Sequence, residues 1–353
     1  MKIGLKLLAL LFILITFSCS KEEASNNTDE FIKAADMSML PLIESEGTVY
    51  YNNNNIPEDA LLTLKNAGCN TIRIRLWHTP TINQSGFNEV KALAQRVKNQ
   101  GMKVWLSVHY SDTWADPANQ IKPTAWNGLT FTQLRAQVES YTTTIVNEIQ
   151  PDIFQIGNEI NNGFIFPEGN LASNESQFLL LLESASAAIR ANSSSTKIML
   201  HYAGIDGASW FFSKTAAIDY DYIGLSYYPI WHGTDINLLQ QTITTLGQTN
   251  NKKVLVAETS YPFTFDWNDW TNNVIGLPNQ IHPNYPASPE GQKAFLQQIK
   301  NTVKNTSSGL GFCYWGTEWI AFRGATSTNG SSWENQALWD FNHKALPAMS
   351  IFN

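Results

Sequence analysis

Cysteine and basic side chains are scarce in this sequence. Only 3 of its 353 residues are cysteine, and 23 Lys and Arg stand against 30 Asp and Glu, which gives a formal net charge of −7. A chain with this charge has no electrostatic attraction for nucleic acid or for an anionic membrane surface, so we expect neither as a partner. Cys69 and Cys313 lie in apolar, strand-like runs, and we expect buried free thiols rather than a disulfide.

Near the N-terminus, the apolar run Leu7–Phe17 is too short to span a bilayer as a native helix. Two lysines precede the run and Ser18-Cys19 ends it, which is the arrangement of an export signal. The small residue before Cys19 resembles a bacterial lipoprotein box. We therefore expect residues 1–18 to be a signal peptide and residues 19–30 to be a flexible tether after a lipidated Cys19, against the alternative of simple secretion.

These features predict an exported lipoprotein of the outer membrane that faces the cell exterior. The lipid would be its only contact with the membrane, and residues 31–353 would form one monomeric catalytic domain.

Downstream of the tether, short apolar runs alternate with longer helical patterns. The strand-like runs are FIKAADMS, NTIRIRLW, MKVWLSVHY, DIFQIG, KIMLHYAG, YIGLSYYP, KKVLVAETSYP and LGFCYWGTEW. A helical pattern follows each run, and we expect the last helix within residues 335–349. Hairpin turn signals are missing, and parallel strands require crossover helices. Eight such units predict a single (β/α)8 TIM barrel with extended βα loops. The alternative, an open doubly wound sheet, lacks a Gly-rich phosphate loop after the first strand.

In a (β/α)8 barrel the active site lies at the C-terminal ends of the strands. The polar and aromatic side chains expected there are Arg73, Arg75, Trp77, His109, Tyr110, Ser111, Asp112, Asn158, Glu159, His201, Tyr227, Tyr228, Glu258 and Trp315. If these residues had only a structural role, several charges would be buried at one end of the barrel, which is unfavourable in free energy. Many of the 12 Trp stand beside turn and polar residues, where their flat faces can stack on sugars.

Two carboxylates, Glu159 and Glu258, end the fourth and seventh of these strands. Cleavage of a glycosidic bond needs a proton donor and a second carboxylate on the other face of the sugar ring. The pair therefore predicts a glycosidase, and the alternative for Glu159 is a cap on the next helix.

Four stretches closely resemble glycoside hydrolase family 53, the endo-β-1,4-galactanases: HYSDTWADPANQIKPTAW, QIGNEINNGFIFPEGN, YIGLSYYPIWHG and GFCYWGTEWI. The resemblance spans nearly all of residues 34–342. It implies an endo-acting, retaining hydrolase that cleaves β-1,4-galactosidic bonds in galactan and type I arabinogalactan by double displacement, with no cofactor for catalysis. One departure is YWGTEW, which stands where the family commonly has a Glu-Pro pair after the first Trp.

By this resemblance Glu159 is the general acid/base and Glu258 the nucleophile. A nucleophile must stay ionised beside a cation, and we expect Arg75 to be that cation because it lies nearer the mouth than Arg73. Asn158 would hold the 2-hydroxyl group of the sugar, and Trp315 would lie beneath that sugar. The other expected substrate contacts are His109, Asp112, Trp114, His201 and Tyr228.

A structural calcium ion is also expected. The loop TFDWNDWTNN places oxygen side chains at Asp266, Asn268 and Asn272, and hard cations bind such alternating oxygens. Bacterial members of the family hold a calcium between this loop and the one after the eighth strand, where Glu334 would supply a carboxylate. The alternative is a polar loop without metal.

Two other functions stay open. One is a related (β/α)8 endo-glycanase that acts on another β-glycan, mannan or xylan, or on arabinogalactan side chains. Its groove would differ, because the axial 4-hydroxyl of galactose bends a β-1,4-galactan chain. The other is a non-catalytic, glycan-binding surface lipoprotein, which would not need the glutamate pair.

Overall fold

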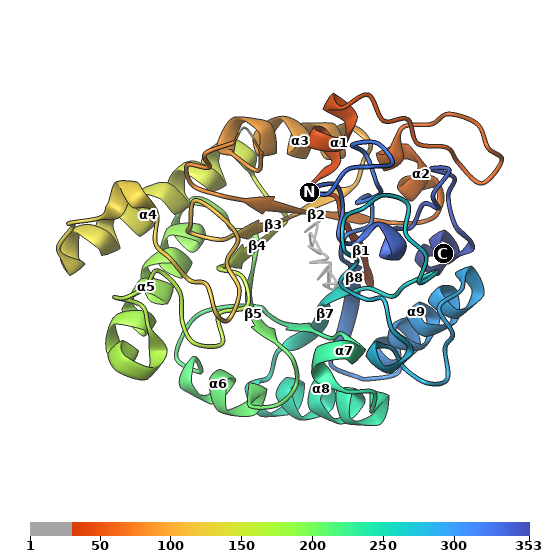
Figure 1. The fold of residues 1–353 in the computed structure, drawn as a ribbon. Helices are drawn as coiled ribbons and strands as arrows, with labels where there is room; N and C mark the ends of the chain where they lie inside the picture. The colour runs from red at the N-terminus through yellow and green to blue at the C-terminus, as the bar shows by residue number, and fades with distance from the viewer. Residues whose placement is uncertain (1–29, 83) are drawn as a thin grey trace, which may run out of the picture. The chain divides into compact units, whose positions relative to one another are not determined.

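The computed structural model describes residues 30–82 and 84–353. The predicted signal peptide, the lipidation site Cys19 and nearly all of the tether lie outside the described residues. From Phe31 onward, eight parallel strands pair in chain order and close into a barrel, with helices around it (Figure 1). The predicted (β/α)8 barrel is confirmed.

The strands of the barrel are short. They are β1 (Ile32–Asp36), β2 (Thr71–Leu76), β3 (Lys103–Val108), β4 (Ile153–Ile156), β5 (Lys197–Ala203), β6 (Tyr222–Ser226), β7 (Lys253–Thr259) and β8 (Gly309–Tyr314). The α-helices are α1 (Leu40–Ser45), α2 (Ala60–Asn66), α3 (Phe87–Asn99), α4 (Phe131–Ile149), α5 (Leu171–Asn192), α6 (Ala208–Lys214), α7 (Pro229–His232), α8 (Ile236–Asn250) and α9 (Pro289–Lys304). Short 3-10 turns are η1 (Thr124–Trp126), η2 (Pro278–Gln280), η3 (Glu334–Gln336) and η4 (Pro347–Phe352).

The hydrophobic pattern places the helices against the sheet. Strands β2, β4 and β6 are buried along their whole length, because helices cover the outside of a parallel barrel and side chains fill its interior. On α3 the buried face consists of Val90, Leu93, Ala94 and Val97, as the 3.6-residue period predicts. Side chains cap the first turns of α2, α4, α5, α8 and α9, and these caps are Asp59, Thr130, Asn170, Asp235 and Ser288.

The prediction of a last helix within residues 335–349 was wrong. Trp339 forms an antiparallel bridge with Ala345, and the Asp340 carboxylate accepts hydrogen bonds from the backbone N–H groups of Asn342 (2.8 Å) and Lys344 (2.9 Å). A side chain that captures backbone donors in this way competes with helix formation. Only η3 and η4 interrupt this segment, and η4 is held to α9 by Lys300, whose amine donates to the Ile351 carbonyl at 2.8 Å.

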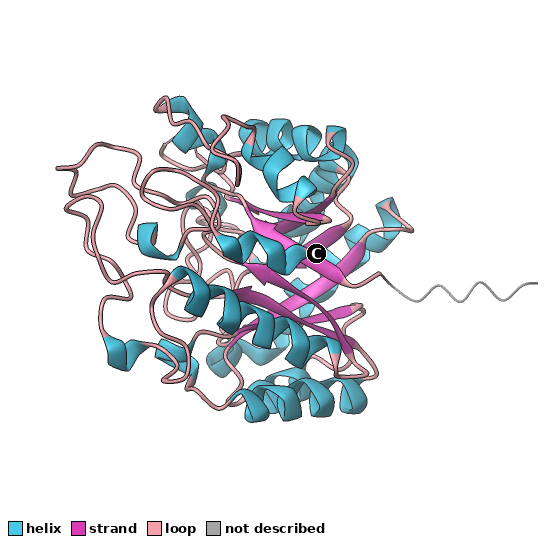
Figure 2. Ribbon diagram, turned by 90° about the vertical axis from the view of Figure 1, so that its right-hand side faces the viewer, coloured by secondary structure: helices cyan, strands magenta, loops and turns pink. Residues whose placement is uncertain are grey.

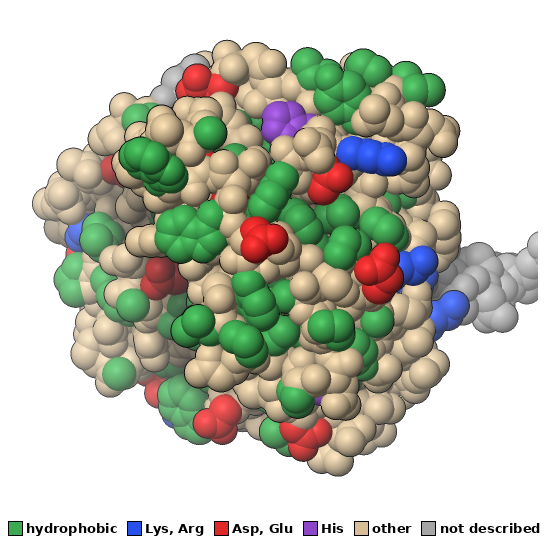
Figure 3. Space-filling view, turned by 45° about the vertical axis from the view of Figure 1, so that its right-hand side comes forward, with side chains coloured by type: hydrophobic (Ala, Val, Ile, Leu, Met, Phe, Trp, Pro, Cys, Tyr) green, Lys and Arg blue, Asp and Glu red, His purple; other side chains and the backbone are tan. Residues whose placement is uncertain are grey.

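The long loops that follow the strands gather at one end of the barrel (Figure 2). The longest come after β3, β4, β7 and β8, so the C-terminal face carries most of the irregular chain. Cys69 and Cys313 are buried free thiols, as predicted. No helix within residues 30–82 or 84–353 combines the length and hydrophobicity that crossing a bilayer requires. On the face shown in Figure 3, Lys and Arg are few and scattered among hydrophobic and acidic side chains.

Closure of the barrel depends on one glycine. Gly311 of β8 lies opposite Ile32 of β1, and a Cβ at this position would meet the Ile32 carbonyl oxygen at 2.3 Å. We predict that Gly311→Ala lowers the free energy of unfolding by about 3 kcal/mol, because the clash is with backbone and the strands must separate. Gly276→Ala is the control, since its Cβ meets nothing within 4 Å. Urea denaturation measures both, and equal stability of the two variants would contradict the prediction.

Candidate active site

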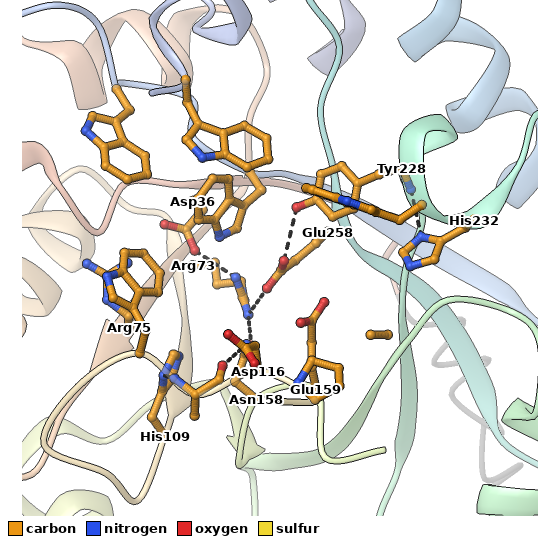
Figure 4. A pocket seen from close by; sticks show the side chains of 18 residues that line it. Asp36, Arg73, Arg75, His109, Asp116, Asn158, Glu159, Tyr228, His232 and Glu258 are labelled. Atoms are coloured by element: carbon orange, nitrogen blue, oxygen red, sulfur yellow. Dashed lines mark hydrogen bonds and ion pairs between the residues drawn. The ribbon is translucent and has the colours of Figure 1, made fainter. Parts of the chain in front are cut away.

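A cavity of about 540 Å³ opens at the C-terminal end of the strands. Figure 4 shows the side chains that point into it from almost every strand end. The lining residues are Asp36, Arg73, Arg75, His109, Trp114, Ala115, Asp116, Pro117, Asn158, Glu159, Ala203, Tyr228, Trp231, His232, Glu258, Trp315, Trp319 and Trp333.

Glu258, on β7, is held in the cavity by two donors. Its Oε1 lies 2.8 Å from Arg73 Nη2, and its Oε2 accepts a hydrogen bond from the Tyr228 hydroxyl at 3.0 Å. The same guanidinium contacts Asp36 Oδ2 at 2.8 Å and donates to Asn158 Oδ1 at 2.8 Å (Figure 4). Arg73 is 1% exposed, so one buried cation joins β1, β2, β7 and the segment just beyond β4.

The expectation that Arg75 accompanies Glu258 was therefore wrong. Both arginines point to the barrel interior, because residues i and i+2 of a strand share a face. Arg75 lies one level nearer the mouth, where its guanidinium stacks on the Trp114 ring at 3.8 Å and donates to Ser85 Oγ at 3.0 Å. Arg75 still lines the cavity, but Arg73 supplies the charge next to Glu258.

Glu159 lies just beyond β4, in an unusual backbone conformation. Its φ is +48°, and Gly157 before it has a φ of +72°, so the strand turns sharply there. Gln120, from the loop after β3, donates to the carbonyl oxygens of Asn158 (2.8 Å) and Glu159 (3.3 Å) and fixes the turn. This turn directs the Glu159 carboxyl group into the cavity, where Ser226 donates to its Oε1 at 2.5 Å.

The environments of the two carboxyl groups differ. Burial, and then the charge of Glu258, raise the pKa of Glu159 to about 8. Burial also raises the pKa of Glu258, but the Arg73 charge and the Tyr228 hydrogen bond oppose that rise. A carboxyl group with a raised pKa can donate a proton near neutral pH, whereas one beside a cation stays ionised. The surroundings thus favour a proton on Glu159 more than on Glu258.

Glu159, His201 and Glu258 offer ligand atoms within 4.8 Å of one another, which raises the question of a metal. Both Glu258 oxygens already face the donors Arg73 and Tyr228, and a bound cation would lie beside the fixed charge of Arg73. The donor set fits acid–base chemistry better than metal coordination.

The structure brings most of the predicted substrate contacts into the cavity. Those that line it are Arg75, His109, Trp114, Asn158, Tyr228 and Trp315. His201 is fully buried beneath Glu159. Asp112 is not among the lining residues; its carboxylate accepts hydrogen bonds from the backbone N–H groups of Thr79 (3.0 Å) and Thr124 (2.8 Å), so it shapes the loop after β3.

Further lining residues were not predicted as site residues. They are Asp36, Asp116, Trp231, His232, Trp319 and Trp333. Asp36 ends the first strand, which was a usable signal. Trp319 and Trp333 lie on loops and Trp231 lies in the four-residue helix α7, where no periodicity marks the direction of a side chain, although each stands close to Gly, Pro or Ser.

The predicted calcium residues lie in two adjacent loops. Glu334 Oε1 accepts a hydrogen bond from the Asn268 backbone N–H at 2.7 Å, which joins the loop after β8 to the loop after β7. Asp266 Oδ2 accepts from the Thr264 hydroxyl at 3.0 Å, and Asn272 is exposed. Three other oxygens are buried and accept no hydrogen bond from any residue that the structure describes: Glu334 Oε2, Asp269 Oδ2 and Asn273 Oδ1.

Known proteins resemble the chain over almost its whole length. Residues 32–352 match the model of Glycosyl hydrolase family 53. An arabinogalactan endo-β-1,4-galactanase of Cellvibrio japonicus is 35% identical, with 98% of this chain and 96% of the relative covered. An endo-β-1,4-galactanase of Bacillus subtilis is 33% identical, with 92% and 85% covered.

Solved structures agree. The family 53 catalytic domain of Ignisphaera aggregans superposes with a TM-score of 0.87 at 36% identity, covering 92% of this chain and 96% of that one. A fungal β-1,4-galactanase superposes with a TM-score of 0.80 at 30% identity, covering 91% and 98%. A family 113 β-1,4-mannanase, at 13% identity and a TM-score of 0.53, shares the fold alone. The resemblance seen in the sequence is confirmed: the chain belongs to Glycosyl hydrolase family 53 and is a glycoside hydrolase.

Proposed function

We propose that the protein is an endo-acting β-1,4-galactanase that cleaves galactan and type I arabinogalactan with retention of configuration. The observation that carries this proposal is the pair Glu159 and Glu258, whose carboxyl oxygens lie within 4.8 Å of each other. Retaining glycosidases place their two carboxyl groups about 5 Å apart, which leaves no room for a water between nucleophile and sugar. The choice of galactan rests on the relatives named as galactanases.

In the first step Glu159 is protonated and Glu258 is ionised. Glu159 gives its proton to the glycosidic oxygen while a Glu258 oxygen attacks the anomeric carbon, so the C–O bond breaks and a glycosyl ester forms. In the second step the ionised Glu159 takes a proton from water, whose oxygen attacks the anomeric carbon and releases Glu258. Both steps need Glu159 to change protonation state, and a pKa of about 8 allows that change near neutral pH.

Arg73 and Tyr228 would act on the nucleophile. Their donors hold the two Glu258 oxygens and stabilise the charge that returns to Glu258 when the ester breaks. Asn158 Nδ2 donates to the Ala115 carbonyl at 2.9 Å and has a second N–H for the 2-hydroxyl of the sugar.

Aromatic rings would bind the chain of sugars. Trp114 and Trp319 stack at 6.2 Å with an interplanar angle of 16°, and the Trp315 and Trp333 rings lie 4.4 Å apart. Trp231, which also lines the cavity, is 54% exposed. Rings arranged in this way offer apolar faces for the C–H faces of several sugars. A related enzyme for mannan or xylan, and a glycan-binding protein without activity, remain the competing functions.

We also propose that the protein is an exported, monomeric lipoprotein anchored through Cys19 in the outer membrane and facing the exterior. The support is the sequence pattern of residues 1–19. The barrel adds one consideration: β1 begins at Ile32, and the N-terminal end of a barrel strand lies opposite the active-site face. The described chain thus enters the barrel at the end away from the cavity.

A structural Ca²⁺ between the loops after β7 and β8 is a further proposal. Oxygen atoms suit this hard cation, and three buried oxygens without donors, from Asp269, Asn273 and Glu334, lie in these two loops. Burial raises the pKa of Glu334, with the Asn268 N–H opposing and the Asp269 charge adding to the rise. A cation would satisfy these oxygens and offset the repulsion. The ligand set thus shifts from the expected Asp266, Asn268 and Asn272 toward Asp269, Asn273 and Glu334.

The catalytic pair can be tested with isosteric variants. Glu159→Gln and Glu258→Gln each should lower kcat on β-1,4-galactan roughly 10⁴-fold, because neither amide can give or take the required proton or form the ester. The exposed Glu290→Gln serves as control, and urea denaturation checks that all variants fold.

Wild-type enzyme should release galactooligosaccharides from galactan and none of the corresponding products from mannan or xylan. With Glu258→Ala and an aryl β-galactobioside, azide should restore turnover, release the aryl alcohol and yield the α-galactobiosyl azide. A variant of either glutamate that keeps a tenth of the wild-type rate would remove it from the mechanism.

Calcium should raise the melting temperature more than it changes the rate. A ligand at 100 times its Kd stabilises the folded state by about 2.7 kcal/mol, and Asp269, Asn273 and Glu334 are not among the residues that line the cavity. The melting temperature is measured with excess calcium and with a strong chelator. In Glu334→Gln the hydrogen bond to Asn268 can persist while the charge is lost, so the response to calcium should disappear. An unchanged melting temperature, with no metal in elemental analysis, would exclude the site.

Lipidation can be followed with labelled palmitate in cells that express the full chain. The label should appear on the wild-type protein, which should sediment with membranes, and Cys19→Ala should lose both properties. Cys69→Ala is the matched control, because that thiol is buried in the barrel. Equal labelling of the wild type and the Cys19 variant would disprove the anchor.

A further inference from the structure

Glu159 is hydrogen-bonded to a serine that no step of the proposed reaction uses. Ser226 is the last residue of β6 and is fully buried. Its Oγ lies 2.5 Å from Glu159 Oε1 and donates a hydrogen bond to it. On the other side of that hydroxyl, His201 Nε2 lies 3.0 Å away. The three groups form a chain that runs from the barrel interior to the cavity.

The register of the sheet explains this alignment. In the β5–β6 pair, His201 lies opposite Gly224 and Ala203 lies opposite Ser226. Both side chains point inward, and Ser226 stands one level nearer the mouth than His201. A Cβ at Gly224 would lie 2.8 Å from Met199 Sδ and 3.0 Å from Ala257 Cβ, so the glycine leaves space for these two side chains, while His201 Cδ2 would be in ordinary contact at 3.4 Å.

The direction of donation along these hydrogen bonds follows from the atoms that can only be donors. The Gln155 amide is fixed because its Oε1 accepts from Arg73 Nε at 3.3 Å and from Trp105 Nε1 at 3.1 Å, two groups that can only donate. Its Nε2 is therefore the atom 3.1 Å from His201 Nδ1. The backbone N–H of Glu159, another obligate donor, points at the same Nδ1 at 3.4 Å.

The Glu159 N–H directed at Nδ1 places the single imidazole proton on Nε2. Gln155 Nε2 adds a shared contact, because its two hydrogens also face the Gly157 carbonyl and Ser107 Oγ, each at 2.9 Å. The other neighbour of Nδ1, Asn158 Oδ1 at 3.2 Å, already accepts from Arg73 and shares the Gln155 amide. Burial and the Arg73 charge hold the pKa of His201 well below its usual value, so the ring is neutral. His201 Nε2–H then donates to Ser226 Oγ, and the only hydrogen of that hydroxyl is left for Glu159.

We propose that His201 and Ser226 form a one-directional donor chain that stabilises the ionised form of Glu159 and so sets the pH range in which it can alternate between acid and base. They are positioning residues, since neither contacts the reacting atoms. The inference rests on the proposed role of Glu159 as acid/base. A donor to a carboxylate favours the charged form. This hydrogen bond, together with the Arg73 charge, counteracts the rise in the pKa of Glu159 that burial, Glu258 and Asp116 cause.

The chain matters most in the second step. There Glu159 must be ionised although it is buried, and the Ser226 hydroxyl and the Arg73 charge favour that form. The charge of Glu258 is absent in this step, because its carboxylate is esterified. Without the Ser226 donor Glu159 holds its proton more tightly, which helps it little as an acid and weakens it as a base.

The test compares pH profiles of kcat/KM on β-1,4-galactan. In the wild type the descending limb reports the ionisation of Glu159, whose pKa is about 8. In Ser226→Ala that limb should move about one pH unit higher, the size expected for loss of a hydrogen bond to a charged group, while the ascending limb stays in place. Ser260→Ala is the matched control, because its buried hydroxyl donates to Gln336 Oε1 at 2.7 Å. A Ser226→Ala profile that is lower at every pH but unshifted would overturn the proposal.

Two histidine variants separate donation from packing. The amide nitrogen of Gln can take the place of Nε2, so His201→Gln can still donate to Ser226. In His201→Asn the amide reaches only the Nδ1 position, where the Glu159 N–H already points. The descending limb should stay near the wild-type position in His201→Gln and shift upward in His201→Asn. Identical profiles for the two variants would show that donation from the Nε2 position to Ser226 does not matter.

A measurement without substrate separates this inference from the proposed function. The protein is labelled with ¹³C at the glutamate carboxyl carbons, and the Glu159 signal, assigned through Glu159→Gln, is titrated. Its pKa should rise by about one unit in Ser226→Ala and stay constant in Ser260→Ala. An unchanged pKa refutes the donor chain even if the wild type cleaves galactan. A shifted pKa supports the chain even if galactan is not cleaved, in which case the proposed function fails alone.

Discussion

The buried guanidinium of Arg73 is the interaction on which the rest of the site depends. It contacts Asp36 of β1, Asn158 just beyond β4 and Glu258 of β7 at 2.8 Å each. A buried ion pair that loses one partner costs about 3–5 kcal/mol, so these strand ends are tied to one another. Because the positive charge lies against Glu258 and Glu159 has no cation contact of this kind, the two carboxyl groups differ in proton affinity. The division of roles between the glutamates thus begins with an arginine on a different strand.

The sequence alone predicts the barrel and the strand positions of the two glutamates, since strand–helix alternation forces parallel pairing and strand ends share one face. It does not predict which arginine meets Glu258. Arg73 and Arg75 share a face by the two-residue period, but their depth depends on the tilt of the strands and on Asp36 of β1. Both features belong to the tertiary structure, which the sequence pattern of one strand does not show.

Loops limited the prediction in the same way. Asp112 and Asp116 stand four residues apart in one loop, yet only Asp116 lines the cavity, because the path of a loop follows from hydrogen bonds that no periodicity reveals. The missing last helix has a comparable cause. Its apolar spacing suits a helix, but the Asp340 carboxylate binds the backbone donors that the helix would use.

The backbone at Glu159 gives a different view of the same site. A φ of +48° lies in the left-handed region, which glycine adopts without strain. A residue with a Cβ loses roughly 1–2 kcal/mol of conformational free energy there. Folding alone would favour glycine there, next to Gly157. The position instead holds the carboxyl group on which the proposed chemistry depends, so the protein keeps a local conformation that weakens its own fold. At this position the residue that would stabilise the fold best differs from the residue that the proposed chemistry needs. The hydrogen bonds from Gln120 to the carbonyls of Asn158 and Glu159 stabilise the turn and offset part of that cost.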